Sequence, residues 1–331
     1  MWRRFLWPFA LTFAVGLAIP FALVLLADPY GVSPARLVSS EHVIPTQRRF
    51  IVADIIRSGR YESFIVGTST VNSINPAWLE AAFGGRFANV AVHGATPYEQ
   101  MRVLDLVLRQ KPAPRMIILG LDDTWCSRVQ PARYHPQVQF PEWLFEDSRL
   151  GHLTHLLNWH AVELARRKLE IAVGYSKTRV AANGFYDDLP PDSTWSLEKA
   201  MPRLATDMLA TARFDSSFGA ATSFQAVSLL DKALSRSAES THLLGVLMPT
   251  YLPQGAIGIV PNACKAAIAG ILRERGGTTL DFMLPSPWTT NASNFWDRLH
   301  FRQAIADVLP GRMREGFENH PSPDGLYQRL E

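Results

Sequence analysis

The chain has 331 residues, of which 47% are hydrophobic and 19% charged, with a formal net charge of +3. This composition supplies a substantial apolar core and argues against wholesale disorder. The small, evenly spread positive charge argues against nucleic acid as a partner, and no cysteine and histidine cluster of the zinc-binding type appears.

The N-terminus carries a predicted membrane anchor. Arg3 and Arg4 precede an uncharged run of 23 residues, Phe5–Ala27, and about 20 apolar residues suffice to span a bilayer. Leu25 stands where a signal-peptide cleavage site needs a small residue, which favours an uncut anchor over a cleaved signal. The alternative is a buried hydrophobic helix of a soluble domain. Because positively charged flanks stay in the cytoplasm, we predict a single-pass protein of the bacterial inner membrane with everything after Asp28 periplasmic.

Beyond the anchor, the pattern predicts a loop or extended stalk over 32–47 and a helix over 47–58. Short apolar runs suited to buried parallel strands then follow at Phe64–Gly67, Phe87–Val92, Met116–Leu121, Leu243–Met248 and Thr279–Phe282. Helical patterns follow most of these runs; one begins at Thr96, and the last covers 301–309. This alternation predicts an α/β fold, a three-layer α/β/α sandwich around a parallel sheet.

The stretch over 125–222 interrupts the alternation. It contains one long helical pattern over 150–172 and a second near 196–213, in which Pro202 favours a bend. We therefore predict an anchor at 1–28, a stalk and first helix at 29–60, and an α/β domain at 61–331 with this insertion. An insertion between strands lies near the strand ends, where ligands bind in open α/β sheets. A lid, a substrate platform and an oligomer contact all remain open as its role.

Two cysteines are present, Cys126 and Cys264. In an oxidising compartment they are compatible with one disulfide, and equally with two unpaired buried thiols. Neither stands in a context that would activate it as a nucleophile.

Two distant segments carry candidate catalytic residues. Ser69 follows a predicted buried strand, and Asp297 and His300 stand three positions apart just before the last predicted helix. A serine needs a base to become a nucleophile at neutral pH, and that base works best when a carboxylate orients it. The simpler readings are a serine that caps a turn and an acid–histidine pair that caps a helix or forms a surface ion pair.

An early strand-end serine with a late Asp-x-x-His resembles the SGNH (GDSL-like) hydrolases, over most of residues 60–310 apart from the insertion. The resemblance implies a flavodoxin-like sheet, with Ser69 as nucleophile, His300 as base and Asp297 as the acid that orients the base. It also implies that backbone N–H groups of Ser69 and Gly94 hold the oxyanion, and it implies neither a cofactor nor a metal.

One motif residue departs from the family pattern. Gly-x-Asn-Asp of the family aligns with 120–123, so that Asp122 stands where an asparagine amide normally contributes to the oxyanion site. A carboxylate would repel the developing charge, whereas one amide donor contributes about 3 kcal/mol. Protonation of Asp122, replacement by another donor and loss of hydrolysis all remain open.

By this resemblance we expect an extracytoplasmic esterase or O-acyltransferase that acts on acyl esters of an exported cell-envelope polysaccharide. The alternative is a catalytically inactive scaffold or glycan-binding subunit that assists a membrane acyltransferase. A third reading is a carbohydrate-binding module built on the insertion.

Other polar and aromatic residues have simpler readings. His93 is an alternative base or a strand-end packing residue. A predicted helix surface or core accounts for three histidines better than metal binding does: His152, His155 and His160. A solvated turn accounts better than a calcium site for three acids: Asp187, Asp188 and Asp192. Core packing or stacking on sugar rings fits four tryptophans: Trp125, Trp143, Trp159 and Trp195.

Overall fold

The computed structural model describes residues 2–44, 47–127, 131–156, 158–186, 190–205, 224–253 and 260–331. The chain forms two compact units. One comprises 1–58 with 141–182, and the other comprises 59–140 with 183–331. The predicted stalk and the middle of the predicted insertion belong to the same unit as the predicted anchor.

The larger unit is built on a sheet that has six strands in the described part of the chain, in the order β2-β1-β3-β4-β5-β6. The strands are β1 (Ser63–Val66), β2 (Phe87–Asn89), β3 (Met116–Leu121), β4 (His242–Leu247), β5 (Thr278–Asp281) and β6 (Gln328–Leu330). All neighbours pair in parallel except β6, which runs antiparallel to β5. The predicted α/β class and all five predicted strands are confirmed. The sequence did not predict β6, because a short polar edge strand has no apolar run.

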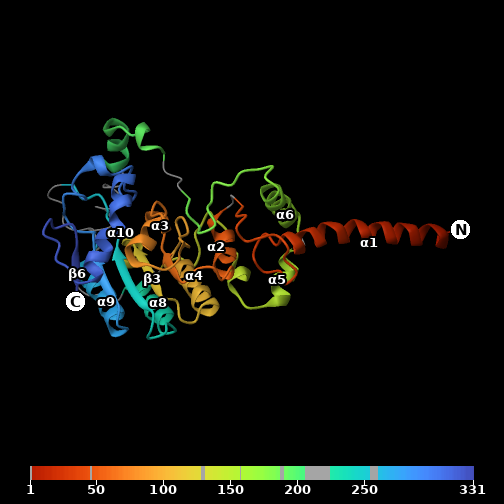
Figure 1. The fold of residues 1–331 in the computed structure, drawn as a ribbon, viewed down its shortest axis with the longest axis horizontal. Coiled ribbons are helices and arrows are strands. Elements are labelled where there is room, and N and C mark those ends of the chain that lie inside the picture. Colours follow the sequence, from red (N-terminus) through yellow and green to blue (C-terminus); the bar gives the residue numbers. More distant parts are fainter. Residues whose placement is uncertain are drawn as a thin grey trace. The chain divides into compact units, whose positions relative to one another are not determined.

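Helices cover both faces of this sheet (Figure 1). One group is α3 (Pro76–Phe83) and α10 (Gln303–Phe317), and the other is α4 (Pro97–Gln110), α8 (Gln225–Leu234) and α9 (Asn262–Glu274). The starts of α3 and α4 follow from local sequence: the Asn75 side chain caps α3, and Thr96 forms a capping box with Glu99. Residues 197–205 are also helical, and the rest of the predicted 196–213 helix lies outside the described residues.

A disulfide ties the carboxyl end of β3 to α9. It joins Cys126, at the end of the short 3-10 helix η2 (Asp123–Cys126), to Cys264 in the first turn of α9, with Cα atoms 5.7 Å apart. Both cysteines are buried. Of the two states that the sequence left open, the structure therefore has the bonded one.

The smaller unit contains α1 (Trp2–Ala27), α2 (Arg48–Arg57), the 3-10 helix η3 (Glu142–Phe145), α5 (Arg149–Leu156) and α6 (Trp159–Ala172). Within α1, the segment Arg4–Ala27 is long and apolar enough to cross a membrane. Residues 4–19 of this helix are exposed, whereas Val24 and Ala27 near its end are buried against the unit. The predicted anchor thus ends inside a folded unit, where α6 and α5 contact α1.

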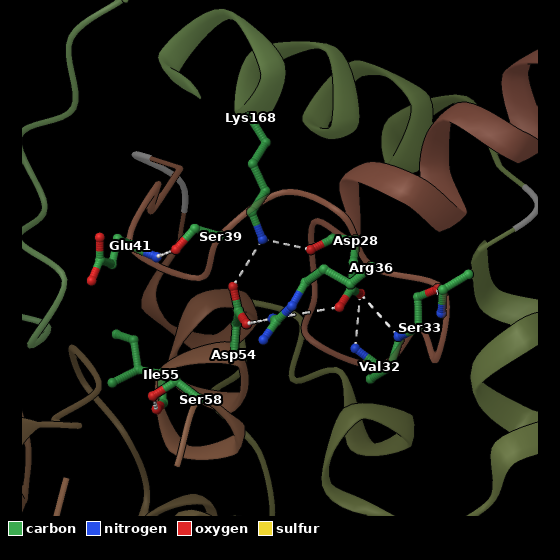
Figure 2. A network of polar contacts seen from close by, with 11 residues as sticks. Asp28, Val32, Ser33, Arg36, Ser39, Glu41, Asp54, Ile55, Ser58 and Lys168 are labelled. Carbon is green, nitrogen blue, oxygen red and sulfur yellow. Dashed lines mark hydrogen bonds and ion pairs between the residues drawn. The ribbon is translucent and has the colours of Figure 1, made fainter. Parts of the chain in front are cut away.

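A buried ionic network fixes the chain just after α1 (Figure 2). The Lys168 ammonium of α6 donates to the backbone oxygen of Asp28 at 2.6 Å and to a carboxylate oxygen of Asp54 at 3.1 Å. Arg36 donates to the other Asp54 oxygen at 2.6 Å and lies 3.5 Å from the Asp28 carboxylate. The network therefore ties α6 to Asp28 and to Asp54 of α2, and the segment predicted as a loop or extended stalk belongs to the same compact unit.

The single helix predicted over 150–172 is in fact two helices. Asn158 has an extended backbone (φ −147°, ψ 158°), and its side chain accepts a hydrogen bond from the Ala161 N–H at 2.8 Å. Asparagine competes with the helical backbone in this way and favours the N-cap position. As a result α5 ends at Leu156 and α6 begins at Trp159.

Candidate active site

Close backbone packing places Ser69 at the carboxyl end of β1. The chain leaves β1 through Gly67 and turns into the 3-10 helix η1 (Ser69–Val71). A Cβ atom on Gly67 would lie 2.9 Å from the carbonyl oxygen of Gly120 in β3, and a Cβ on Gly120 would overlap the Val71 side chain. Glycine at both positions therefore lets β1, β3 and η1 approach one another and sets where Ser69 lies.

A short loop holds His300. An isolated β-bridge joins Phe295 to Phe301, both fully buried, and closes the loop at its base. Inside it, the Asp297 carboxylate accepts the backbone N–H groups of Leu299 at 2.9 Å and of His300 at 3.0 Å. The acid and the imidazole are thus fixed by the same turn.

Ser69, His300 and Asp297 form a continuous hydrogen-bonded relay. Nε2 of His300 lies 2.8 Å from the Ser69 hydroxyl, and Nδ1 lies 2.8 Å from each carboxylate oxygen of Asp297. The side chains of His300 and Asp297 are 28% and 29% exposed, so the relay is reachable from solvent. The structure therefore brings together the three residues that the sequence singled out.

The electrostatic setting of Asp297 suits an orienting carboxylate. Burial acts to raise its pKa, but the hydrogen bond from His300, the charge of that imidazole and two backbone N–H groups act in the opposite direction and outweigh burial. The pKa of Asp297 therefore lies below its ordinary value. An ionised carboxylate at this position holds the proton on Nδ1 and leaves Nε2 free to accept one from Ser69.

A pocket of about 220 Å³ opens beside the relay. One part of its wall comes from η1 and the turn after it, and this part consists of Ser69, Thr70, Asn72 and Ser73. The other part comes from the histidine loop and consists of Trp296, Asp297, His300 and Phe301. Pro190 and Arg203 complete the lining. A substrate carbonyl in this pocket would have the serine hydroxyl and the imidazole on one side.

Asn72 is a site residue that no sequence motif indicates. Side chains three residues apart eclipse in a 3-10 helix, so Asn72 lines the same pocket as Ser69. Its backbone N–H donates to the Ser69 carbonyl oxygen at 3.2 Å, and its side-chain amide contacts Nε2 of His93. The signal that could have revealed it is the Ser-x-x-Asn spacing in a tight turn after a strand. His93, the alternative base of the sequence analysis, faces Asn72.

The two other predicted oxyanion residues are not among the described residues that line the pocket. Gly94 is exposed, has a left-handed backbone (φ 55°) and lies beside the His135 ring. Asp122 is buried and accepts hydrogen bonds from the hydroxyl of Thr68 at 2.7 Å and from the backbone N–H of Thr124 at 3.1 Å. Any contribution of Gly94 or Asp122 to an oxyanion site stays a prediction.

Burial sets the protonation tendency of Asp122. Burial and, after it, the neighbouring charge of Asp123 raise the pKa of this carboxyl, against the lowering effect of its hydrogen bonds to Thr124 and Thr68. Asp123 itself pairs with Arg298 of the histidine loop. Asp122 thus links the segment after β1 to the segment after β3, and its carboxyl oxygens have hydrogen-bond donors within the protein.

The remaining histidine and acid candidates have partners inside the fold. His152 and His155 bond to the backbone oxygens of Glu146 at 3.0 Å and Gly151 at 2.8 Å, and His160 packs edge-on against Phe50. No group of three potential metal ligands occurs among the residues that the structure describes. Of the three acids in the predicted solvated turn, Asp192 forms an ion pair with Arg302. Asp187 and Asp188 lie outside the described residues.

The four tryptophans divide by exposure. Trp125 is fully buried, the ring of Trp143 stacks on His155, and the indole N–H of Trp195 donates to the Phe295 carbonyl at 2.9 Å. Trp159 is 80% exposed at the start of α6. Of the four, Trp159 alone presents a wide open ring surface.

No family model matches the chain, and no curated protein does. The chemistry of the site follows from its own geometry. A serine hydroxyl, an imidazole and a carboxylate in hydrogen-bonded sequence, beside a pocket, can remove the hydroxyl proton and return it to a leaving group.

Proposed function

We propose that this protein is a membrane-anchored serine esterase or O-acyltransferase of the SGNH type. Its substrates would be acyl esters of an exported cell-envelope polysaccharide. The observation that carries the proposal is the Ser69–His300–Asp297 relay opening on a pocket. An ion pair or helix cap accounts for Asp297 and His300 alone, but neither accounts for the serine hydroxyl 2.8 Å from Nε2.

The relay supports acyl transfer in two steps. The Ser69 oxygen attacks the ester carbonyl while its proton passes to Nε2 of His300, and Asp297 stabilises the imidazolium through Nδ1. The imidazolium then returns the proton to the departing alkoxide, which leaves an acyl ester on Ser69. Attack on this ester by water gives hydrolysis, and attack by a glycan hydroxyl gives transfer. In both cases His300 takes the proton of the attacking group.

Two groups at η1 are suited to the oxyanion. One is the backbone N–H of Ser69, and the other is the second N–H of the Asn72 side-chain amide, whose nitrogen also contacts Nε2 of His93 and which lines the same pocket. An amide three residues after the nucleophile would replace the asparagine that the family has at the position of Asp122. This assignment resolves the departure from the motif without requiring Asp122 to be protonated during the reaction.

The sheet order supports the SGNH assignment. The five parallel strands are ordered 2-1-3-4-5, the flavodoxin-like order, in which ligands bind at the carboxyl ends of the strands. Ser69 follows the carboxyl end of β1, and His300 comes after β5 in the chain. The agreement concerns both the topology and the position of the site on it.

The N-terminal helix and the disulfide support an extracytoplasmic location. Arg3 and Arg4 precede the apolar segment of α1, and positively charged flanks stay cytoplasmic. A disulfide between Cys126 and Cys264 fits an oxidising compartment such as the periplasm. We therefore place the pocket on the outer side of a bacterial inner membrane.

The test is labelling of the full chain, in detergent or nanodiscs, with a serine-directed fluorophosphonate, together with hydrolysis of p-nitrophenyl acetate. The full chain is needed because Val24, Ala27 and Asp28 are buried in the smaller unit. Wild type should be labelled at Ser69 and hydrolyse the ester, whereas Ser69→Ala and His300→Ala should do neither. Ser228→Ala, which removes an exposed hydroxyl on α8, is the matched control.

An unlabelled wild type with an intact fold would contradict the proposal. It would favour the scaffold alternative, in which the same fold assists a membrane acyltransferase without performing the reaction. Labelling without ester hydrolysis would point to a transferase that requires its own acyl donor.

A further inference from the structure

The pocket beside Ser69 contains a cationic side chain that the reaction does not use. Arg203 belongs to the helical segment 197–205, is exposed and lines this pocket. The two arginines of the adjoining loop are each paired with a carboxylate, Arg298 with Asp123 and Arg302 with Asp192. In the described part of the chain Arg203 has no such partner.

Within the described lining of the pocket, no carboxylate is paired with Arg203. Among the described lining residues the one acid is Asp297, and both of its oxygens are engaged by His300. Charges interact more strongly in a partly enclosed pocket than in open water. The Arg203 guanidinium therefore favours a negatively charged group on the part of the ligand that lies against it.

The planar shape of the guanidinium restricts the chemical class of the ligand further. Its planar set of N–H donors matches the two oxygens of a carboxylate or a sulfate ester. Trp296 lines the same pocket, and an indole ring is suited to contact with the apolar side of a sugar ring. A sugar that carries an acidic group satisfies both features, whereas a neutral sugar leaves the guanidinium without a partner.

We propose that Arg203 binds an anionic oxygen-bearing group of the substrate, separate from the ester that reacts with Ser69. The substrate is then an ester of an acidic saccharide. This inference rests on the proposed function of Ser69 as nucleophile. The oxyanion is a carboxylate or a sulfate ester, and Arg203 determines specificity without taking part in proton transfer.

The experiment measures how short saccharides protect Ser69 from fluorophosphonate labelling, with the full chain in phosphatidylcholine nanodiscs. The ligands are trigalacturonate, sulfated maltotriose and neutral maltotriose. The variants are wild type, Arg203→Gln and the control Arg273→Gln, an exposed arginine near the end of α9 that does not line the pocket. Comparing the two anionic ligands shows which oxyanion is preferred.

We expect at least one anionic trisaccharide to protect wild type and Arg273→Gln, and maltotriose to protect neither. Relative to its own labelling rate without ligand, Arg203→Gln should need about 10-fold more anionic ligand for the same protection. Equal protection of Arg203→Gln, or equal protection by maltotriose, would overturn the inference.

A second measurement keeps this inference separate from the proposed function. If wild type is not labelled at all, Ser69 is not the proposed nucleophile. Calorimetric titration of wild type and Arg203→Gln with trigalacturonate and with sulfated maltotriose then decides whether Arg203 binds an anion. Binding of either ligand that weakens about 10-fold in Arg203→Gln supports anion recognition at Arg203, and equal or absent binding refutes it.

Discussion

The molecule contains two clusters of acidic and basic side chains that differ in what they leave open. In the smaller unit, Lys168 and Arg36 bridge the carboxylate of Asp54 and the chain at Asp28, and both aspartates are buried. In the larger unit, His300 bridges Asp297 and Ser69, and its side chain is 28% exposed. The first cluster directs its hydrogen bonds inward, and the second lines a pocket.

This difference separates a structural role from a chemical one. A buried charge must be paired within the protein, because an unpaired one costs several kcal/mol. A nucleophile must instead stay accessible to a substrate, with its base aimed at it. Substitutions in the first cluster should therefore reduce stability and leave activity intact. Substitutions in the second cluster should reduce activity and have a smaller effect on stability.

The largest expected effect is on activity, from Asp297→Asn. The amide keeps the shape of the side chain but no longer holds the proton on Nδ1 of His300, so kcat should fall about 10⁴-fold. The rate of p-nitrophenyl acetate hydrolysis checks this, and at neutral pH the melting temperature should fall only by the stability that the lowered pKa of Asp297 contributes. Asp307→Asn, an exposed acid on α10, is the matched control. A loss of less than 10-fold in Asp297→Asn would mean that the relay is structural.

The next effect is on stability, from Lys168→Met. Removing this ammonium leaves the backbone oxygen of Asp28 without its donor and the charge of Asp54 half-paired, which should cost about 3–5 kcal/mol. Hydrogen exchange in α2 and α6, with denaturant unfolding, measures the loss. The control is Arg167→Gln, which breaks an exposed pair with Glu163 on the same helix and should cost about 0.5 kcal/mol. Equal effects of the two variants would show that the network contributes no more than a surface pair.

A smaller effect on activity is expected from Asn72→Ala. Loss of one amide donor from an oxyanion site lowers kcat about 10²-fold, with KM little changed. Steady-state kinetics with p-nitrophenyl acetate test this, and fluorophosphonate labelling should slow in parallel, because a negative charge also develops on that probe. An unchanged kcat would mean that backbone N–H groups alone stabilise the oxyanion and that Asn72 does not contribute.

The sequence predicts the sheet and the relay because their signals are local or follow a motif. Each parallel strand is an apolar run, and the serine, acid and histidine stand in positions that resemble a known layout. The split between α5 and α6 is harder to predict. It depends on whether one polar residue, Asn158, bonds to its own backbone.

The grouping of residues 1–58 with 141–182 is harder still, because it depends on contacts between distant segments. Lys168 stands in the charged run 166–168, which reads as a solvated surface. A cue to its burial is helical spacing, since it shares a face with Ala161, Leu164 and Ala165, all buried. The sequence did not predict Asn72 and Arg203 as site residues for a related reason. Neither belongs to a motif, and only the folded pocket brings them close to Ser69.

The smallest expected effect concerns pH and distinguishes two aspartates of the larger unit. The pKa of Asp122 is raised, by burial first and by Asp123 after it. Its contribution to stability is therefore complete below its ordinary pKa and is lost as the pH rises through the native value. Asp122→Asn removes this pH-dependent loss of stability, because an amide does not ionise. The amide oxygen can still accept a hydrogen bond from Thr124, and the amide N–H can donate one to the Thr68 hydroxyl. The variant should gain melting temperature relative to wild type as the pH rises above the ordinary aspartate pKa of about 4.

The contribution of Asp297 to stability changes with pH in the opposite direction. Its pKa is lowered despite burial, because the hydrogen bond and charge of His300 outweigh that effect, so its contribution is present above its ordinary pKa and is lost as the pH falls. Asp297→Asn should therefore approach wild type in melting temperature as the pH falls, whereas Asp122→Asn should exceed wild type more as the pH rises. Asp122→Asn should also keep the wild-type kcat, since Asp122 does not line the pocket. A fall in kcat in that variant would show that the carboxyl group reaches the reacting atoms after all.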